Sequence, residues 1–98
     1  MARRALVLSR QALAEYDEIA AFSLQRFGLH VADAYMAGLD TVCQRLRDYP
    51  ELAPIDPRIR PEVRVLHYRS HRILYIVDPT QVLIVRILHQ ARAAPTAL

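Results

Sequence analysis

The chain has 98 residues, of which 53% are hydrophobic, and a formal net charge of +3 at pH 7. This length and composition predict one small globular domain and exclude both a disordered chain and a second hydrophobic core. Its apolar runs are far shorter than the roughly 20 residues of a membrane span, and the stretch after Arg3-Arg4 is too short for a secretory signal.

The first third of the chain predicts a short strand followed by a helix. Arg3 to Leu8 is brief and apolar, as expected of a strand at a sheet edge, and Ser9 suits a helix N-cap. From residue 10 to residue 27, side chains that can be buried recur every three or four positions. Phe22 falls outside this stripe, and Gly28 predicts a left-handed stop. The stripe consists of Ala12, Leu13, Tyr16, Ile19, Ala20, Ser23, Leu24 and Phe27.

A second amphipathic helix is predicted from His30 to Asp48, ending before Tyr49-Pro50. Its closeness to the first helix predicts an antiparallel helical hairpin. Cys43 lies in the apolar stripe of this helix, which favours a small core residue over a nucleophile. Because it is the one cysteine, it has no partner for an internal disulfide, and this fits a reducing cytoplasm.

The second half of the chain predicts three strands. Residues 51–61 contain three prolines and read as a loop, whereas residues 62–68 have strand character. Two runs rich in β-branched residues, 73–77 and 82–88, are joined by turn residues at 78–81 and predict a β-hairpin. The second run is apolar on both faces, so we expect an inner strand that is covered on both sides.

These elements predict a single domain, residues 1–98, of the α+β class. The expected order is β-α-α-β-β-β, an antiparallel sheet with the two-helix hairpin packed on one face. After His89, the Ala- and Pro-rich tail 90–98 is expected to be flexible.

The sequence offers little conventional catalytic chemistry. No cluster of metal ligands, glycine-rich phosphate loop or nucleophile with its base is visible, so no metal and no cofactor are predicted. The chain contains arginines but no lysine. This composition reflects either a coding bias or a surface that binds carboxylates or phosphates. Three interpretations are open for the basic set: a metal-free ribonuclease site, a docking surface for an acidic segment, or solvated strand-end charges. The set is Arg64, Arg72, Arg86, His89 and Arg92.

The chain resembles the ParE branch of the ParE/RelE toxin superfamily. The resemblance runs from the first strand to Arg92, and its most specific parts are HRILY at 71–75 and VRILHQAR at 85–92. Weaker matches in the helical part are Tyr16, Ala34-Tyr35, Leu39, Leu46 and Tyr49-Pro50.

The resemblance implies a cytoplasmic toxin of a type II toxin–antitoxin pair that inhibits DNA gyrase by binding it, with no catalytic residue. It also implies a hetero-oligomeric complex with a ParD-like antitoxin, contact with DNA only through that antitoxin, and no membrane association. Under this interpretation, His89 and Arg92 are expected to bind the target. The expected antitoxin-binding residues are Phe22, Arg64, Arg72 and Arg86.

Two alternatives remain open. The RelE-like branch cleaves messenger RNA on the ribosome, and Arg72 and His89 would then be the catalytic residues. Against this, the tail lacks the tyrosine often found near the end of those nucleases, the chain has no lysine, and it is only mildly basic. The other alternative is an inactive member that serves only as an antitoxin-binding module.

Overall fold

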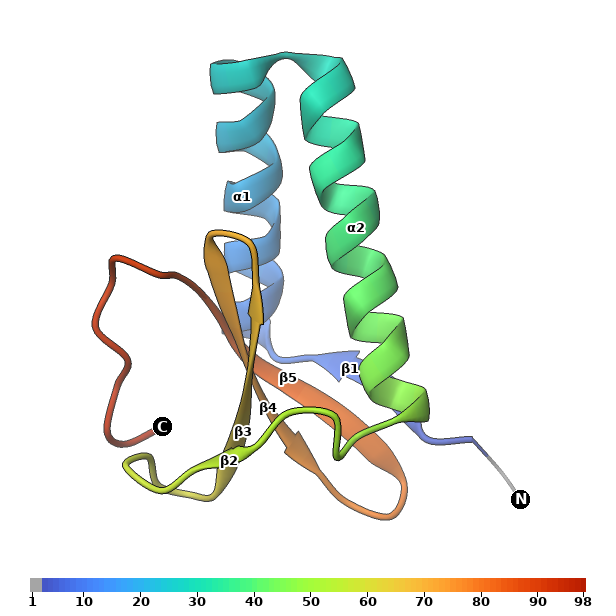
Figure 1. Ribbon diagram of the computed structural model, residues 1–98, viewed down its shortest axis with the longest axis vertical. Helices are drawn as coiled ribbons and strands as arrows, with labels where there is room; N and C mark the ends of the chain where they lie inside the picture. Colours follow the sequence, from blue (N-terminus) through green and yellow to red (C-terminus); the bar gives the residue numbers. More distant parts are fainter. Residues whose placement is uncertain (1–2) are drawn as a thin grey trace.

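The computed structural model describes residues 3–98 and has the α+β architecture that the sequence predicts (Figure 1). A hairpin of two helices lies against one face of a five-stranded sheet. No helix in this part of the chain is both long and apolar enough to cross a membrane. The elements are β1 (Ala5–Leu8), α1 (Arg10–Phe27), α2 (Leu29–Asp48), β2 (Ile55–Asp56), β3 (Val63–Tyr68), β4 (His71–Val77) and β5 (Gln81–His89).

The helical hairpin begins and turns at the residues that the sequence indicates. The Ser9 hydroxyl accepts a hydrogen bond from the amide of Ala12 at 3.0 Å, which confirms the predicted N-cap. Gly28 ends α1 with φ of +84° and its amide donates to the Leu24 carbonyl at 3.0 Å. Because α2 starts at the next residue, Gly28 alone joins the two helices, and only glycine adopts such a positive φ without strain.

The sheet corrects one prediction, because it is mixed and not wholly antiparallel. Its strand order is β1-β5-β4-β3-β2, and β1 lies at the edge, as expected, but pairs with β5 in parallel. Leu6 is opposite Val82 and Leu8 is opposite Ile84. A local apolar pattern predicts a strand but carries no information about the direction of a partner some 75 residues away. The two-residue β2 was also missed, inside the proline-containing loop.

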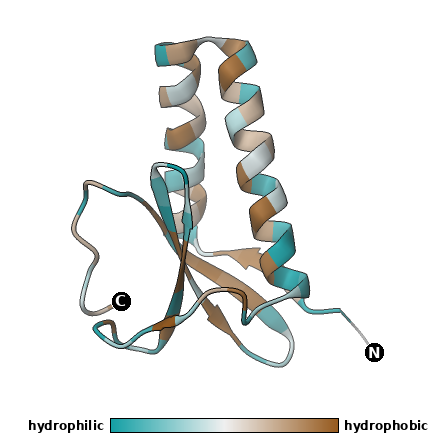
Figure 2. Ribbon diagram, in the orientation of Figure 1, coloured by the Kyte–Doolittle hydropathy of each residue, from teal (hydrophilic) through white to brown (hydrophobic). Residues whose placement is uncertain are grey.

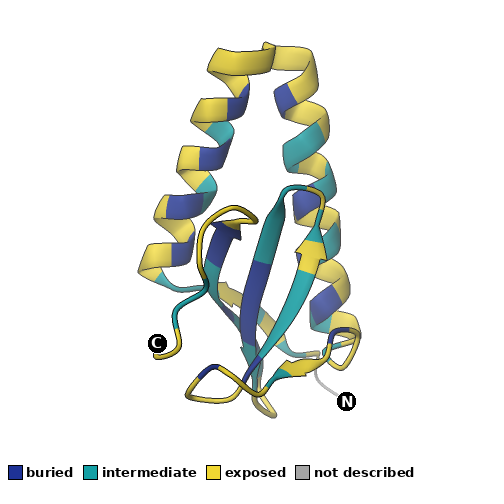
Figure 3. Ribbon diagram, turned by 60° about the vertical axis from the view of Figure 1, so that its left-hand side comes forward, coloured by how far each residue is buried: buried dark blue, intermediate teal, exposed yellow. Residues whose placement is uncertain are grey.

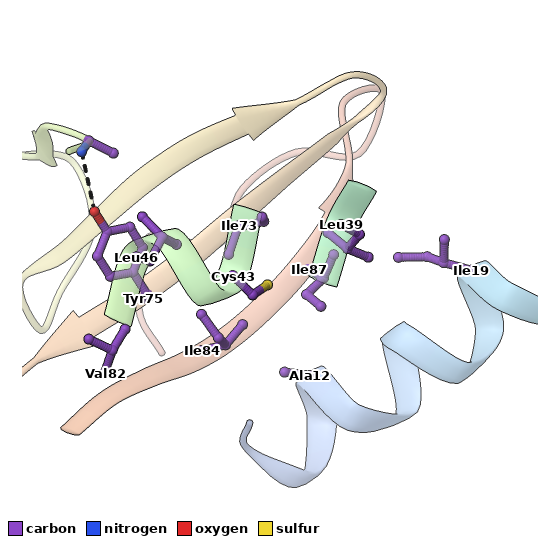
Figure 4. Close-up of a cluster of buried hydrophobic side chains, with 11 residues drawn as sticks. Ala12, Ile19, Leu39, Cys43, Leu46, Ile73, Tyr75, Val82, Ile84 and Ile87 are labelled. Atoms are coloured by element: carbon purple, nitrogen blue, oxygen red, sulfur yellow. Dashed lines mark hydrogen bonds between the residues drawn. The ribbon is translucent and has the colours of Figure 1, made fainter. Parts of the chain in front are cut away.

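β5 is an inner strand between β1 and β4, and apolar clusters cover both of its faces, as expected. The hydrophobic character of the central strands is visible in Figure 2. The larger cluster lies between the sheet and the helices and contains Leu39, Leu46 and Tyr75 (Figure 4). The smaller one lies on the opposite face, where Ile59 and Ala94 cover Leu74 and Leu88. The chain therefore covers its own second face with the 57–62 loop and the C-terminal tail.

A bulge between β4 and β5 sets which side chains of β5 face the helices. Tyr75 pairs with Ile84, whereas its neighbour Leu74 pairs with Arg86, so Val85 is the extra residue. Side chains alternate along a strand, and one extra residue reverses the alternation. As a result, both Ile84 and Ile87 belong to the helix-side cluster.

The tail after β5 lies against the loop that precedes β3. The amide of Arg60 donates to the carbonyl of Thr96 at 2.9 Å, and the amide of Leu98 donates to the carbonyl of Arg60 at 2.9 Å. These bonds give the tail a defined position, while the flexibility predicted for residues 90–98 stays a prediction.

Candidate functional site

A surface hollow of about 340 Å³ lies where α1 crosses the C-terminal end of β5. Its apolar wall is formed by Ile19, Phe22 and Ile87, and its rim carries both acidic and basic groups. The whole lining consists of Glu15, Glu18, Ile19, Phe22, His71, Ile87, His89 and Arg92, and we call it the His89 pocket. Three of the residues that the sequence singled out, Phe22, His89 and Arg92, therefore meet in one place.

Two histidines stand side by side in this pocket. His71 and His89 are paired across β4 and β5, and their rings meet edge to face with centroids 5.4 Å apart. Nδ1 of His71 lies 2.6 Å from the Tyr35 hydroxyl, within hydrogen-bond distance. Burial, and then the neighbouring His89, lower the pKa of His71 below its usual 6.5. The His71 imidazole is therefore held toward its neutral form, which suits binding more than a fixed positive charge.

Glu15 fixes the wall of the pocket to the sheet. Its carboxylate accepts from the amide of Ile87 at 2.9 Å and from Nε and one terminal nitrogen of Arg86 at 2.8–3.2 Å. Ser9 also holds the start of α1 against β5, because its hydroxyl donates to the Val85 carbonyl at 2.9 Å at the residue that follows β1. Arg86 thus has a carboxylate partner within the chain.

The sequence analysis did not single out Glu15, although the position of Glu15 in the sequence indicates its role. Glu15 lies three residues after Ala12 and four before Ile19, which is within the buried stripe of α1. An acid in a buried stripe needs a compensating partner, because an isolated charge is costly to remove from water. That partner is Arg86, the arginine in the middle of the apolar strand β5.

The opposite face of the sheet holds Arg72. This side chain lines a groove with Leu74, Asp56 and Ala94, and it donates to the main-chain carbonyl of Arg92. Asp56 in the same groove has its pKa lowered to about 2, chiefly because Arg58 hydrogen-bonds to its carboxylate.

Arg72 and His89 consequently lie on opposite faces of the sheet. Arg72 is opposite Leu88, and His89 is opposite His71, so the two are near each other in register. Yet Arg72 faces the side of Leu74, while His89 faces the helix side with Ile87. The two residues expected to be catalytic in a nuclease therefore line different hollows of the surface.

The four residues expected to bind the antitoxin are dispersed. Phe22 is 60% exposed on α1. Arg64 donates to the carbonyl of Ala53 at 2.7 Å, while Arg72 and Arg86 have the partners given above. Only Phe22 belongs to the His89 pocket.

Two chemical expectations concern metal and thiol chemistry. Within residues 3–98, no group of three His, Cys, Asp or Glu residues is placed to hold a metal ion. Cys43 is buried in the helix-side cluster, as expected of a core residue, and burial raises the pKa of its thiol to about 11. A thiol of that pKa is protonated near neutral pH and is a poor nucleophile.

Comparison with known proteins connects this geometry to a family. Residues 6–94 match the family model described as the ParE toxin of type II toxin–antitoxin system, parDE. Toxin ParE1 of Caulobacter vibrioides is 33% identical over 87 residues, which cover 89% of this chain and 90% of that protein.

Two solved structures share the fold. One is described as the chromosomal ParDE TA system from P. aeruginosa, with a TM-score of 0.76, 20% identity, and coverage of 89% of this chain and 96% of that one. The other is the YoeB dimer from Staphylococcus aureus, with a TM-score of 0.54, 17% identity, and coverage of 87% and 94%. The family match spans most of the chain, and the resemblance noted from HRILY and VRILHQAR is confirmed. The chain belongs to the ParE toxin family of type II toxin–antitoxin systems.

Proposed function

We propose that this ParE-family toxin inhibits DNA gyrase by binding it and that a ParD-like antitoxin neutralises it. The observation that carries the proposal is the placement of Arg72 and His89 on opposite faces of the sheet. General acid–base cleavage of RNA needs its groups within hydrogen-bond reach of one phosphate. That separation favours a toxin that acts by binding over one that cuts RNA.

The His89 pocket is the contact surface that we assign to both partners. It combines an apolar wall, including Phe22, with the basic side chain of Arg92 and the edge-to-face pair of His71 and His89. An antitoxin segment seated on Phe22 would also cover His89 and Arg92, which we assign to the target. Neutralisation then follows from occlusion, because one surface cannot hold two partners at once.

The remaining basic residues have a different role in this proposal. Arg72 and Arg64 already donate to main-chain carbonyls, so they add a peripheral positive charge for the antitoxin and are not its anchors. Arg86, paired with Glu15, shapes the pocket wall.

Gyrase supercoiling by the purified holoenzyme, with and without the purified toxin, tests this proposal. We expect the wild-type chain to inhibit supercoiling and the Arg92→Ala variant to inhibit it less. Arg45→Ala is the matched control, because Arg45 is an exposed arginine of α2 outside the pocket. Full supercoiling in the presence of excess wild-type toxin would contradict the proposal.

A further inference from the structure

The end of the helical hairpin is an uncovered apolar surface. Leu24, Phe27, Leu29 and Val31 are all exposed around Gly28, and we call these four residues the hairpin tip. The tip stands clear of the sheet (Figure 1), and Figure 3 shows continuous exposure along it. Leu24 is 49% exposed and Leu29 is 65% exposed. Such a concentration of large apolar side chains marks an interaction surface.

The shape of the tip limits what can cover it. Residues two positions apart on a helix are turned by about 200°, so Leu29 and Val31 lie on opposite sides of α2. On α1, Phe22 is likewise turned by about 200° from Leu24, and it packs edge to face on Phe27 with ring centroids 6.4 Å apart. A partner that buries all four tip residues must therefore reach both sides of the hairpin. A single segment laid along one side leaves the other side in water, whereas a concave cleft covers both.

The charge of the tip argues against a second copy of this chain as the occupant. Between residues 22 and 31 the ionisable side chains are Arg26 and His30, and there is no acid. A two-fold contact brings the same patch of each copy together, so residues 22–31 of a second copy would offer Arg26 no carboxylate. Within the described residues, Arg26 takes part in no ion pair.

We infer that the hairpin tip inserts into an apolar cleft of a folded protein and that a carboxylate in this cleft pairs with Arg26. That protein is the target that the toxin inhibits, so the inference rests on the proposed function. Phe22 connects the tip to the His89 pocket, since it lines the pocket and packs on Phe27. The target therefore contacts one continuous surface from His89 to the tip, while the antitoxin occludes its pocket half.

The test compares a tip variant with a control of equal chemistry. Leu24→Ser with Leu29→Ser removes two exposed leucines of the tip. Leu13→Ser with Leu52→Ser removes two leucines that are 52% and 50% exposed elsewhere. Arg26→Glu, at the last turn of α1, is compared with Arg45→Glu, at the last turn of α2. Exposed substitutions of this kind leave folding nearly unchanged, which circular dichroism checks.

Each protein is assayed for binding to gyrase holoenzyme, for growth arrest and for binding to its cognate antitoxin. We expect both tip variants to bind gyrase about tenfold more weakly or worse, as for loss of interface anchors, with antitoxin affinity within twofold of the control. Equal gyrase inhibition by tip variant and control would overturn the inference while leaving the proposed function intact. A wild-type chain that arrests growth without binding gyrase would instead overturn both the proposed function and the inference that the tip binds gyrase.

Two further outcomes would also overturn the inference. If the tip variants lost antitoxin binding as fully as gyrase binding, the tip would belong to the antitoxin. If the wild-type chain sedimented as a dimer and the tip variants as monomers, a second copy would be the occupant.

Discussion

Glu15 and Arg86 are 71 positions apart in the chain, and their side chains form a two-point ion pair that joins α1 to β5. The same carboxylate accepts from the Ile87 amide. This one acid thus satisfies a guanidinium and a main-chain amide at the place where β1 has stopped pairing with β5. The pair supports the wall of the His89 pocket, in which Glu15 and Ile87 are both lining residues.

Replacing Glu15 by alanine should lower the free energy of unfolding by about 3 kcal/mol, since it leaves Arg86 and the Ile87 amide without their partner. Urea denaturation measures the loss. Glu18→Ala is the matched control, because Glu18 is exposed one turn further along α1, and it should change stability by less than about 0.5 kcal/mol. Equal stability of the two variants would show that the ion pair is not needed for folding.

Gly38, in the middle of α2, makes room for the Tyr68 side chain. A Cβ at this position would overlap the Tyr68 hydroxyl, which donates to the Tyr35 carbonyl at 3.0 Å. Gly38→Ala should therefore destabilise the protein by about 1–2 kcal/mol through overpacking, although alanine favours helices. In the Gly38→Ala, Tyr68→Phe double variant the hydroxyl is gone, and part of this loss should be recovered. Thermal unfolding of the wild type, the two single variants and the double variant gives the coupling free energy between positions 38 and 68. Additive effects would contradict the steric account.

The pH dependence of stability should show the lowered pKa of His71. Because its folded-state pKa lies below the usual 6.5, the unfolded chain binds the proton more readily. The stabilisation is therefore complete above about pH 6.5 and is lost as the pH falls through the folded-state pKa. NMR titration of the imidazole measures that pKa directly, and His71→Gln identifies its signal. The groups around His71 are Tyr35, Tyr68, His89 and, across the pocket, Glu15, Glu18 and Arg92. A pKa at or above 6.5 would contradict the burial of His71.

Deleting residues 93–98 should lower the free energy of unfolding by about 2 kcal/mol. The deletion removes the two main-chain hydrogen bonds with Arg60, each worth about 1 kcal/mol, and uncovers the cluster under Ala94. Urea denaturation of the shortened and full chains measures this. An unchanged midpoint would instead support the flexible tail that the sequence predicts.

The helices and the β4–β5 hairpin could be predicted because their signals are local. Ser9 and Gly28 bound α1 as predicted, since a cap and a positive φ depend on residues next to them in sequence. The apolar faces of β5 likewise predicted a strand covered on both sides.

The site could be predicted only in part because it depends on distant pairing. HRILY and VRILHQAR indicated that Arg72 and His89 matter, but their placement on opposite faces follows from the register of β4 and β5. The parallel pairing of β1 and the capture of Arg86 by Glu15 join residues about 70–80 positions apart, and no local pattern encodes such pairings. Leu24 and Phe27 belong to the predicted apolar stripe of α1, yet they are exposed because the end of the helical hairpin extends beyond the sheet.

Pulse-labelling of DNA, RNA and protein synthesis after induction of the chain alone in a bacterial host tests the central claim most directly. An inhibitor of gyrase should make DNA synthesis fall first, with signs of DNA damage, and co-expression of the antitoxin should prevent this. A first fall in protein synthesis accompanied by cut messenger RNA would contradict the account and would make Arg72 and His89 candidates for catalysis. A chain that accumulates in folded form without any effect on growth would equally contradict it.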